Sequence, residues 1–270
     1  IHVYLEGNSS TNTDPVGINL KYADYLVNIT REIGLYLIIT IGCNGENGTI
    51  HSLDKVLNFW SLYANRYKDE SHVIFEAHNE PVGWTLNNFT EDDWNKQLIL
   101  YKHIRKLAPE SLILLGSFMS FYDPNNTPDF GAKWLSSNGV SWNNTAFAFH
   151  GYWDIAQVEE TIRLFKNDRS LPALLCTEFN PYDTEKGFNN MCESHLIGWM
   201  QFEWFSNNSD LLGFKGKIEK AGTIWKPEIN NCNWPSHNKA DVPGLNQPFG
   251  IMSRSTGKYL GIESNKIVPK

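Results

Sequence analysis

The sequence predicts an α/β fold, a parallel (β/α)8 TIM barrel whose first strand is not contained in this chain. Three observations predict it. Short apolar runs rich in β-branched residues alternate with longer amphipathic runs, which is typical of a parallel sheet covered by helices. The 270 residues suffice for one domain of barrel size with a well-buried core. Glu80 and Glu178 each follow an apolar run, at the strand end where such a barrel carries its catalytic groups.

Seven segments have the length and composition of strands, whereas a closed barrel of this type needs eight. We therefore expect the first strand and helix to precede Ile1 in a longer protein. The seven strand candidates are residues 1–5, 36–41, 72–77, 112–115, 146–149, 173–176 and 199–204.

Amphipathic segments between these runs are predicted to be helices. Apolar side chains recur in them every three or four residues, as at Leu26, Ile29 and Ile33, which places them on one helix face. The last of three such segments begins within a Thr-Glu-Asp-Asp sequence that predicts a capped N-terminus. The three segments are residues 20–33, 53–67 and 92–107.

The C-terminal part of the chain has a different composition. We assign residues 1–230 to the barrel and residues 231–270 to a linker and a short β-rich tail, the possible start of a second small β domain. Within the tail, residues 249–252 and 259–262 read as two strands around a Ser-Thr-Gly-Lys turn. This hairpin resembles one hairpin of a fascin-like β-trefoil, and an ordinary terminal hairpin is the alternative.

The charge and hydropathy of the chain exclude some classes of partner. The net charge of −7 is spread out without a basic tract, so no nucleic acid is expected as a partner. No run approaches about 20 consecutive apolar residues, so no membrane span is expected. The 10 tryptophans, 11 tyrosines and 15 phenylalanines suit a cleft that binds sugar rings, although packing of a large core explains any one of them equally well.

Seven Asn-x-Ser/Thr sequons predict a secreted glycoprotein with N-glycans on surface loops. The alternative is an asparagine-rich chain that is never glycosylated. The sequons begin at Asn8, Asn28, Asn47, Asn88, Asn125, Asn143 and Asn207.

The four cysteines are too few for a disulfide scaffold. Cys176 lies inside an apolar run and is expected to be a core thiol. Cys192 and Cys232 lie in polar, loop-like sequence, where they could form a bridge. No Cys/His spacing resembles a zinc site, and neither a metal nor another cofactor is expected.

Two carboxylates that face one cleft are what the hydrolysis of a glycosidic bond needs. For retention of configuration the carboxyl groups lie about 5 Å apart, one protonated and the other ionised. Close placement in a dry cleft favours that state, because two like charges at short range do not both ionise easily. We assign these roles to Glu80 and Glu178. The alternative is that each glutamate binds a helix terminus or a lysine.

From Ile1 to Phe205 the sequence resembles glycoside hydrolase family 5, the cellulase and mannanase family. Four motifs carry the resemblance in the family's order. They are Asn-Glu-Pro at residues 79–81, His-x-Tyr at residues 150–152, Glu178 and Trp204.

The resemblance implies a retaining β-glycosidase that acts on β-linked glucan or mannan. Glu80 would be the acid/base and Glu178 the nucleophile. Three further roles follow from the family pattern: Asn79 would hold the substrate 2-hydroxyl, Tyr152 would orient Glu178, and Trp204 would form the floor of the sugar subsite.

His150 would support subsite −1, with a structural histidine of the core as the alternative. Glu76 and His78 share a strand with Glu80 and are interpreted as structural. Trp84 and Trp153 follow the motifs directly, and both outer subsites and core packing remain open for them.

Two positions depart from the family pattern. An arginine is usual around His2, and an Asp-x-His sequence usually ends the third strand where residues 40–44 read Thr-Ile-Gly-Cys-Asn, so the histidine is absent. Both normally support the nucleophile and the sugar. Their loss keeps a second hypothesis open, namely a catalytically impaired carbohydrate-binding or structural glycoprotein on a glycosidase barrel.

Overall fold

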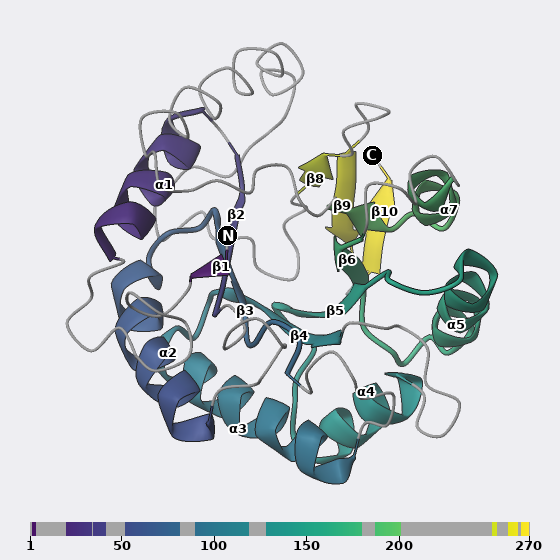
Figure 1. The fold of residues 1–270 in the computed structure, drawn as a ribbon, viewed down its shortest axis with the longest axis horizontal. Coiled ribbons are helices and arrows are strands. Elements are labelled where there is room, and N and C mark those ends of the chain that lie inside the picture. Colours follow the sequence, from purple (N-terminus) through teal and green to yellow (C-terminus); the bar gives the residue numbers. More distant parts are fainter. Residues whose placement is uncertain are drawn as a thin grey trace.

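The computed structural model has a seven-stranded parallel sheet at its centre, with strands in the order β1 to β7 among the described residues. The sheet curls, and the helices lie along its outer side (Figure 1). This architecture confirms the predicted α/β barrel fold. The structure describes residues 2–3, 20–33, 35–41, 52–81, 90–118, 128–179, 187–200, 250–252, 259–263 and 266–269.

All seven predicted strands have a counterpart in the parallel sheet. The sixth strand extends further than predicted and reaches Glu178 itself. The strands are β1 (His2–Val3), β2 (Leu37–Ile41), β3 (Val73–Glu76), β4 (Leu112–Phe118), β5 (Thr145–His150), β6 (Leu174–Glu178) and β7 (Gly198–Trp199).

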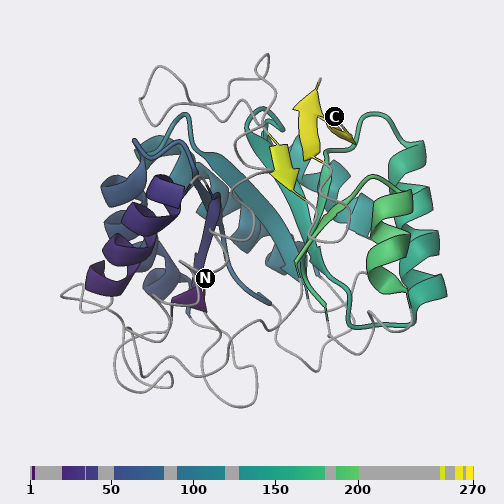
Figure 2. The ribbon, with the colours of Figure 1, turned by 90° about the horizontal axis from the view of Figure 1, so that it is seen from above.

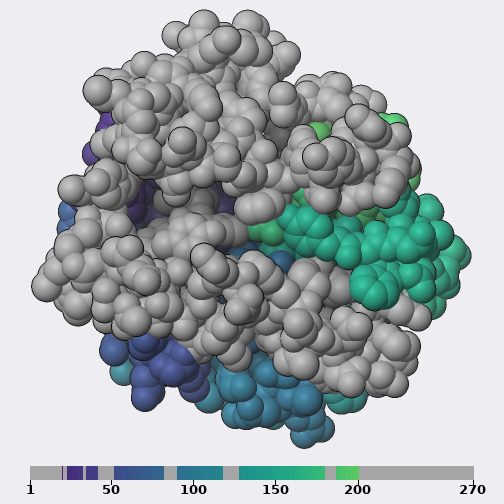
Figure 3. All heavy atoms as spheres, viewed as in Figure 1, coloured from purple at the N-terminus to yellow at the C-terminus, as the bar shows by residue number. Residues whose placement is uncertain are grey.

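The three predicted helices are present, and three more lie between the later strands. The third predicted helix begins one residue early, at Glu91, because Thr90 and Asp93 form a reciprocal capping box. In Figure 2 α1 (purple) and α7 (green) lie at opposite ends of the row of strands, and in Figure 3 α2, α3 and α5 form part of the outer surface. The helices are α1 (Leu20–Ile33), α2 (Leu53–Tyr67), α3 (Glu91–Leu107), α4 (Pro128–Ser137), α5 (Ile155–Asn167) and α7 (Phe188–Ser194).

Side chains alternate between the two faces of each strand, as in β5. Phe147 and Phe149 pack into the larger core between the sheet and the helices. Ala146 and Ala148 belong to the smaller core on the inner face of the sheet. His150 continues the inner series, so its imidazole lies inside the barrel at the carboxyl end of the strand.

Two β-bulges interrupt this alternation at the carboxyl ends of neighbouring strands. In β4 the register with β5 shifts between Gly116 and Phe118, so Ser117 is an extra residue. In β6 the register shifts in the same way and Thr177 is extra. An inserted residue bends a strand and re-aims the side chains that follow it. Glu178 therefore lies opposite His150 rather than facing the helices.

The tail contains one strand more than predicted. Strands β8 (Gly250–Met252) and β9 (Tyr259–Glu263) pair antiparallel, as the predicted hairpin requires, and β10 (Lys266–Pro269) adds to the other edge of β9. The boundary near residue 230 lies outside the described residues, so the division into 1–230 and 231–270 stays a prediction.

The cysteine interpretation is partly wrong. Cys176 is a buried free thiol, as expected, and burial raises its pKa. Cys192 lies in α7 rather than in a polar loop and is equally buried, because its helix packs Phe188 and Met191 into the core. Cys232, the other half of the suggested bridge, lies outside the described residues.

Several predicted features lie outside the part of the chain that the structure describes. Trp204, Trp84 and residues 42–44 are among them. Of the seven sequon asparagines, Asn28 and Asn143 are described, and both are exposed. No described helix has both the length and the apolar character that crossing a membrane would require.

Candidate active site

Glu80 is positioned by the segment that leaves β3. The backbone N–H of Ala77 donates to Leu114 of β4, and that of Asn79 donates to Ile41 of β2 at 3.3 Å. The N–H of Glu80 then donates to the Ser117 carbonyl at 3.1 Å. The chain is thus held from both neighbouring strands, and Glu80 adopts the left-handed region with φ 45°. A non-glycine residue at this φ is uncommon and is typical of functional sites.

Glu178 approaches the same place from the other side of β5. The bulge at Thr177 aligns it with His150, and the N–H of Gly151 donates to its carbonyl at 2.8 Å. Gly151 is required because a Cβ there would lie 2.1 Å from the ring of Phe188. Phe188 in turn stacks on Phe179, the residue after Glu178. Sequence reasoning did not identify this packing, which fixes the strand end from the helix side.

His150 lies between the two carboxylates. Its Nδ1 is 3.0 Å from Oε1 of Glu80 and 3.4 Å from Oε2 of Glu178. One ligand atom from each of the three residues lies within 4.8 Å of the others. None of the three residues is more than 5% exposed. The structure therefore brings together, in one buried cluster, three residues that are far apart in the sequence.

Tyr152 completes the cluster from the end of β5. Its hydroxyl donates a hydrogen bond of 3.0 Å to Oε2 of Glu178, and its ring meets that of His150 edge to face. Burial, together with the charge of Glu178, raises the pKa of Tyr152, so the hydroxyl stays a neutral donor.

The imidazole of His150 is electrostatically tied to the carboxylates. Burial by itself lowers the pKa of a histidine, but Glu178, Glu80 and Glu76 outweigh it and raise the pKa of His150 to about 9. A protonated imidazole donates from Nδ1 and balances part of the negative charge. The attraction between a protonated His150 and the carboxylates of Glu80 and Glu178 is the main electrostatic feature of the site.

Asn79 and His78 lie next to Glu80 and are also buried. Nδ1 of His78 lies 2.7 Å from the backbone carbonyl of Asn79. The side-chain Oδ1 of Asn79 has no hydrogen-bond partner among the described residues. A buried polar atom without a partner is costly unless a ligand satisfies it. Trp153, which follows Tyr152, is 37% exposed and so lies at the surface rather than in the core.

The arrangement suits acid/base chemistry at two carboxylates that share a histidine. Glu80, His150 and Glu178 are also of the types that bind divalent cations, although the sequence predicted no metal. Ser117, which holds the N–H of Glu80, was not singled out from the sequence. Its only signal there is a Gly-Ser pair after an apolar strand.

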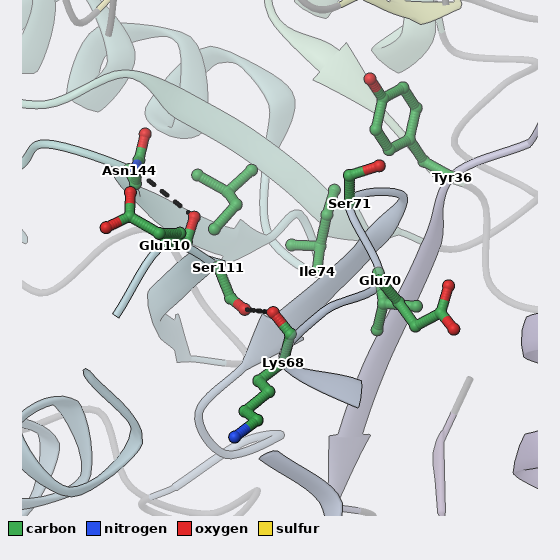
Figure 4. A pocket seen from close by; sticks show the side chains of 10 residues that line it. Tyr36, Lys68, Glu70, Ser71, Ile74, Glu110, Ser111 and Asn144 are labelled. Atoms are coloured by element: carbon green, nitrogen blue, oxygen red, sulfur yellow. Dashed lines mark hydrogen bonds between the residues drawn. The ribbon is translucent and has the colours of Figure 1, made fainter. Parts of the chain in front are cut away.

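A small pocket lies at the opposite end of the sheet (Figure 4). Tyr36, Ser71, Ser111 and Asn144 line it, and each comes just before a strand, which places the pocket at the amino ends of β2 to β5. Neither Glu80 nor Glu178 lines it. In parallel barrels this end serves stability, whereas chemistry lies at the carboxyl ends.

Comparison with protein families identifies one that covers most of the chain. The model of Cellulase (glycosyl hydrolase family 5) matches residues 2–202. Endoglucanase E-5 of Thermobifida fusca is 20% identical over 192 residues, which are 66% of this chain and 39% of that protein. Endoglucanase MaCel5A of Microbulbifer sp. is 20% identical over 247 residues, covering 81% of this chain and 46% of that protein. The chain therefore spans less than half the length of these two relatives.

Among solved structures, a β-mannanase of Thermomonospora fusca in complex with mannohexaose is similar to this chain. The TM-score is 0.57 at 16% identity, and the match covers 77% of this chain and 69% of the other. At this identity the similarity supports the fold.

Proposed function

Because the chain belongs to glycosyl hydrolase family 5, we propose that it hydrolyses β-linked glucan or mannan with retention of configuration at the anomeric carbon. The observation that carries the proposal is the approach of Glu80 and Glu178, with one oxygen from each within 4.8 Å. Retention by double displacement needs carboxyl groups about 5 Å apart, whereas inversion needs a wider gap that admits a water molecule. The spacing between Glu80 and Glu178 thus supports retention rather than inversion.

Glu178 is the proposed nucleophile. It must be ionised to attack the anomeric carbon, and it accepts a hydrogen bond from the neutral hydroxyl of Tyr152. Hydrogen bonds to the charged form of a carboxylate favour that form. In the first step a Glu178 oxygen forms a bond to the anomeric carbon while the bond to the leaving oxygen breaks.

Glu80 is the proposed acid/base. In the first step it gives its proton to the leaving oxygen, and in the second it takes a proton from the water that cleaves the glycosyl-enzyme. Its Oε1 lies 3.0 Å from Nδ1 of His150, so a second proton-carrying group is in direct contact with it.

The remaining predicted site residues are proposed to bind the sugar. Among the described residues the Oδ1 of Asn79 has no partner, so it suits a hydrogen bond from a sugar hydroxyl. His150 contacts Glu80 and Tyr152 contacts Glu178. For Trp204 the family pattern is the support. The endoglucanase and mannanase names of the relatives support a β-glucan or β-mannan as substrate class.

Hydrolysis of dinitrophenyl β-glucoside, β-mannoside and the corresponding cello- and manno-oligosaccharides tests the activity. We expect Glu178→Ala to abolish turnover and Glu160→Gln, an exposed change on α5, to leave it unchanged. Equal inactivity of wild type and Glu178→Ala on every glucan and mannan would contradict the proposal.

Azide separates the roles of the two glutamates. With Glu178→Ala, azide takes the place of the nucleophile and should give a glycosyl azide of opposite configuration to the substrate. With Glu80→Ala, the glycosyl-enzyme still forms from an activated substrate, and azide should give a product of unchanged configuration. An exchange of these two outcomes would reverse the assignment.

A second candidate function is carbohydrate binding without turnover. It is favoured by the departures around His2 and at residues 40–44, where the family's arginine and histidine are absent. Calorimetric binding of cello- or manno-oligosaccharides to a wild type that shows no turnover would establish this alternative.

We also propose that the protein is secreted and carries N-glycans. The support is the number of sequons together with the exposure of Asn28 on α1 and Asn143 before β5. Expression through a eukaryotic secretory pathway, followed by peptide N-glycosidase treatment, should lower the mass. Asn28→Gln and Asn143→Gln should each remove one glycan, and an unchanged mass of the wild type after treatment would refute the proposal.

A further inference from the structure

Glu76 is a buried carboxylate that the proposed reaction does not use. It ends β3, and it is 2% exposed on the inner face of the sheet. Its backbone pairs with Thr40 on one side and Leu114 on the other. Burial of a carboxylate is costly unless other groups satisfy it. Its position therefore needs a reason beyond packing.

Ser117 provides the direct partner. Its hydroxyl donates a hydrogen bond of 2.7 Å to Oε1 of Glu76. Ser117 is the extra residue of the β4 bulge and has a φ of 58°. A non-glycine residue keeps such a backbone conformation only where its surroundings hold it. The bond to Glu76 is one such restraint.

The same serine holds the proposed acid/base. The carbonyl of Ser117 accepts the backbone N–H of Glu80 at 3.1 Å, and Glu80 also has a positive φ. Two residues in the left-handed region are thus joined by one hydrogen bond. The Glu76 side chain anchors the first of them, so a change at Glu76 is transmitted to the Glu80 backbone.

Glu76 also contributes to the charge around His150. The groups that face the imidazole are Glu178 from β6, Glu80 and Glu76 from β3 and the segment after it, and Tyr152 from the end of its own strand. Three of the four are carboxylates. The negative charge of Glu76 therefore favours the protonated imidazole without touching it.

We propose that Glu76 and Ser117 form a positioning pair that fixes the backbone of Glu80, and that the charge of Glu76 also acts on His150. The catalytic part of this inference rests on the proposed function, because Glu80 acts as acid/base only there. Neither residue contacts the substrate in this account. Both act through Glu80 and His150.

A titration of His150 tests the electrostatic part without any substrate. Imidazole signals of histidine-labelled protein are followed by NMR from pH 5 to 11, and His150→Asn assigns the relevant signal. In Glu76→Gln the pKa of His150 should fall by about one pH unit. In Glu159→Gln, which removes a carboxylate beside His195, it should stay unchanged. An unchanged His150 titration in folded Glu76→Gln would overturn this part.

Kinetics of three variants test the positional part. Ser117→Gly keeps the backbone conformation accessible and removes the CH2OH side chain with its hydroxyl, and it should lower kcat roughly 10- to 100-fold with little change in KM. Glu76→Asp keeps the charge but shortens the reach to Ser117, so it should lower kcat while the pKa of His150 is kept. Thr161→Ala, a change at a partly exposed residue on α5 whose hydroxyl donates to the Gln157 carbonyl, should leave kcat unchanged.

The outcomes distinguish this inference from the proposed function. Wild-type kcat in both Ser117→Gly and Glu76→Asp would overturn the positioning role while leaving the glycosidase assignment intact. An inactive wild type would refute the glycosidase assignment. The His150 titration in Glu76→Gln and the shift of the Glu80 amide signal in Ser117→Gly would then still test whether Glu76 and Ser117 act on His150 and Glu80. Should Glu76→Gln not fold, Glu76→Asp and Ser117→Gly carry the test.

Discussion

The hydroxyl of Tyr152 donates a 3.0 Å hydrogen bond to Oε2 of Glu178. Hydrogen bonds to charged groups contribute about 1.5–3 kcal/mol. Tyr152→Phe should therefore reduce kcat/KM on an aryl β-glycoside by roughly 10- to 100-fold. Tyr67→Phe is the matched control, because its hydroxyl bonds Asp24 on α1, away from the site, and it should retain wild-type kcat/KM. Full activity of Tyr152→Phe would contradict the orienting role.

The raised pKa of His150 predicts a loss of stability at alkaline pH. Between its unfolded value of 6.5 and its folded value of about 9, the folded protein holds a proton that the unfolded chain has released. The contribution is complete below pH 6.5 and is lost as the pH rises through about 9. In that window the free energy of unfolding should fall by up to about 1.4 kcal/mol per pH unit. Urea unfolding of wild type and His150→Asn from pH 6 to 10 measures the difference in slope. Identical slopes would refute the prediction.

Alanine substitutions at Gly116 and Gly139, which have nearly the same φ, distinguish the cost of backbone strain from the cost of a steric clash. Gly116 has φ 97° and Gly139 has φ 95°. A Cβ at residue 116 would lie 2.6 Å from the carbonyl oxygen of Ala148, whereas at residue 139 nothing lies within 4 Å. Gly139→Ala should cost about 1–2 kcal/mol from the backbone alone. Gly116→Ala should cost clearly more, as measured by urea unfolding. Equal losses of unfolding free energy in the two variants would show that β4 can shift to accept the Cβ, and would contradict the close packing of Gly116 against Ala148.

The guanidinium of Arg105 joins α3 to the amino ends of β4 and β5. Nη1 donates to the carbonyls of Pro109 at 2.8 Å and Ser111 at 2.7 Å, and Nη2 donates to the carbonyl of Asn144 at 2.8 Å. Arg105→Met should destabilise the protein by at least about 2 kcal/mol in chemical denaturation, because several partly buried carbonyls lose their donor.

Arg105 lies at the amino ends of the strands, away from the candidate active site, so its replacement should affect stability and not activity. Below the unfolding transition, the activity per folded molecule should be unaffected by Arg105→Met. Arg163→Met, an exposed arginine paired with Glu160, should change stability by less than about 0.5 kcal/mol. A similar cost for both arginines would argue against the structural role of Arg105.

The helices show what local pattern can predict. Residues 20–33 and 53–67 form helices with the predicted bounds, because their apolar side chains follow the helical period. Alternation of strand and helix also predicted the parallel sheet. Cys192 shows the limit of that reasoning. Its polar sequence neighbours suggested a loop, yet the contacts of Phe188 and Met191 in α7 bury it.

Sequence reasoning selected Glu80, His150 and Glu178, which the structure brings together, but it did not predict the geometry that brings them together. Glu80 and Glu178 follow apolar runs, and the strand ends of a parallel sheet gather on one side. The bulge at Thr177, which turns Glu178 toward His150, has no sequence signal, because any residue can be the inserted one. The contact of Ser117 with Glu76 depends on a second bulge and joins residues 41 positions apart. Such details come from tertiary packing.

Covalent trapping of the nucleophile tests the central claim most directly. A 2-deoxy-2-fluoro β-glycosyl donor with a dinitrophenyl leaving group, in gluco and manno form, should accumulate as a glycosyl-enzyme on the wild type. Mass spectrometry of the digested protein should place the fluorosugar on Glu178, and Glu178→Ala should remain unlabelled. A label on Glu80, or turnover to the inverted sugar with no trapped species, would contradict the account.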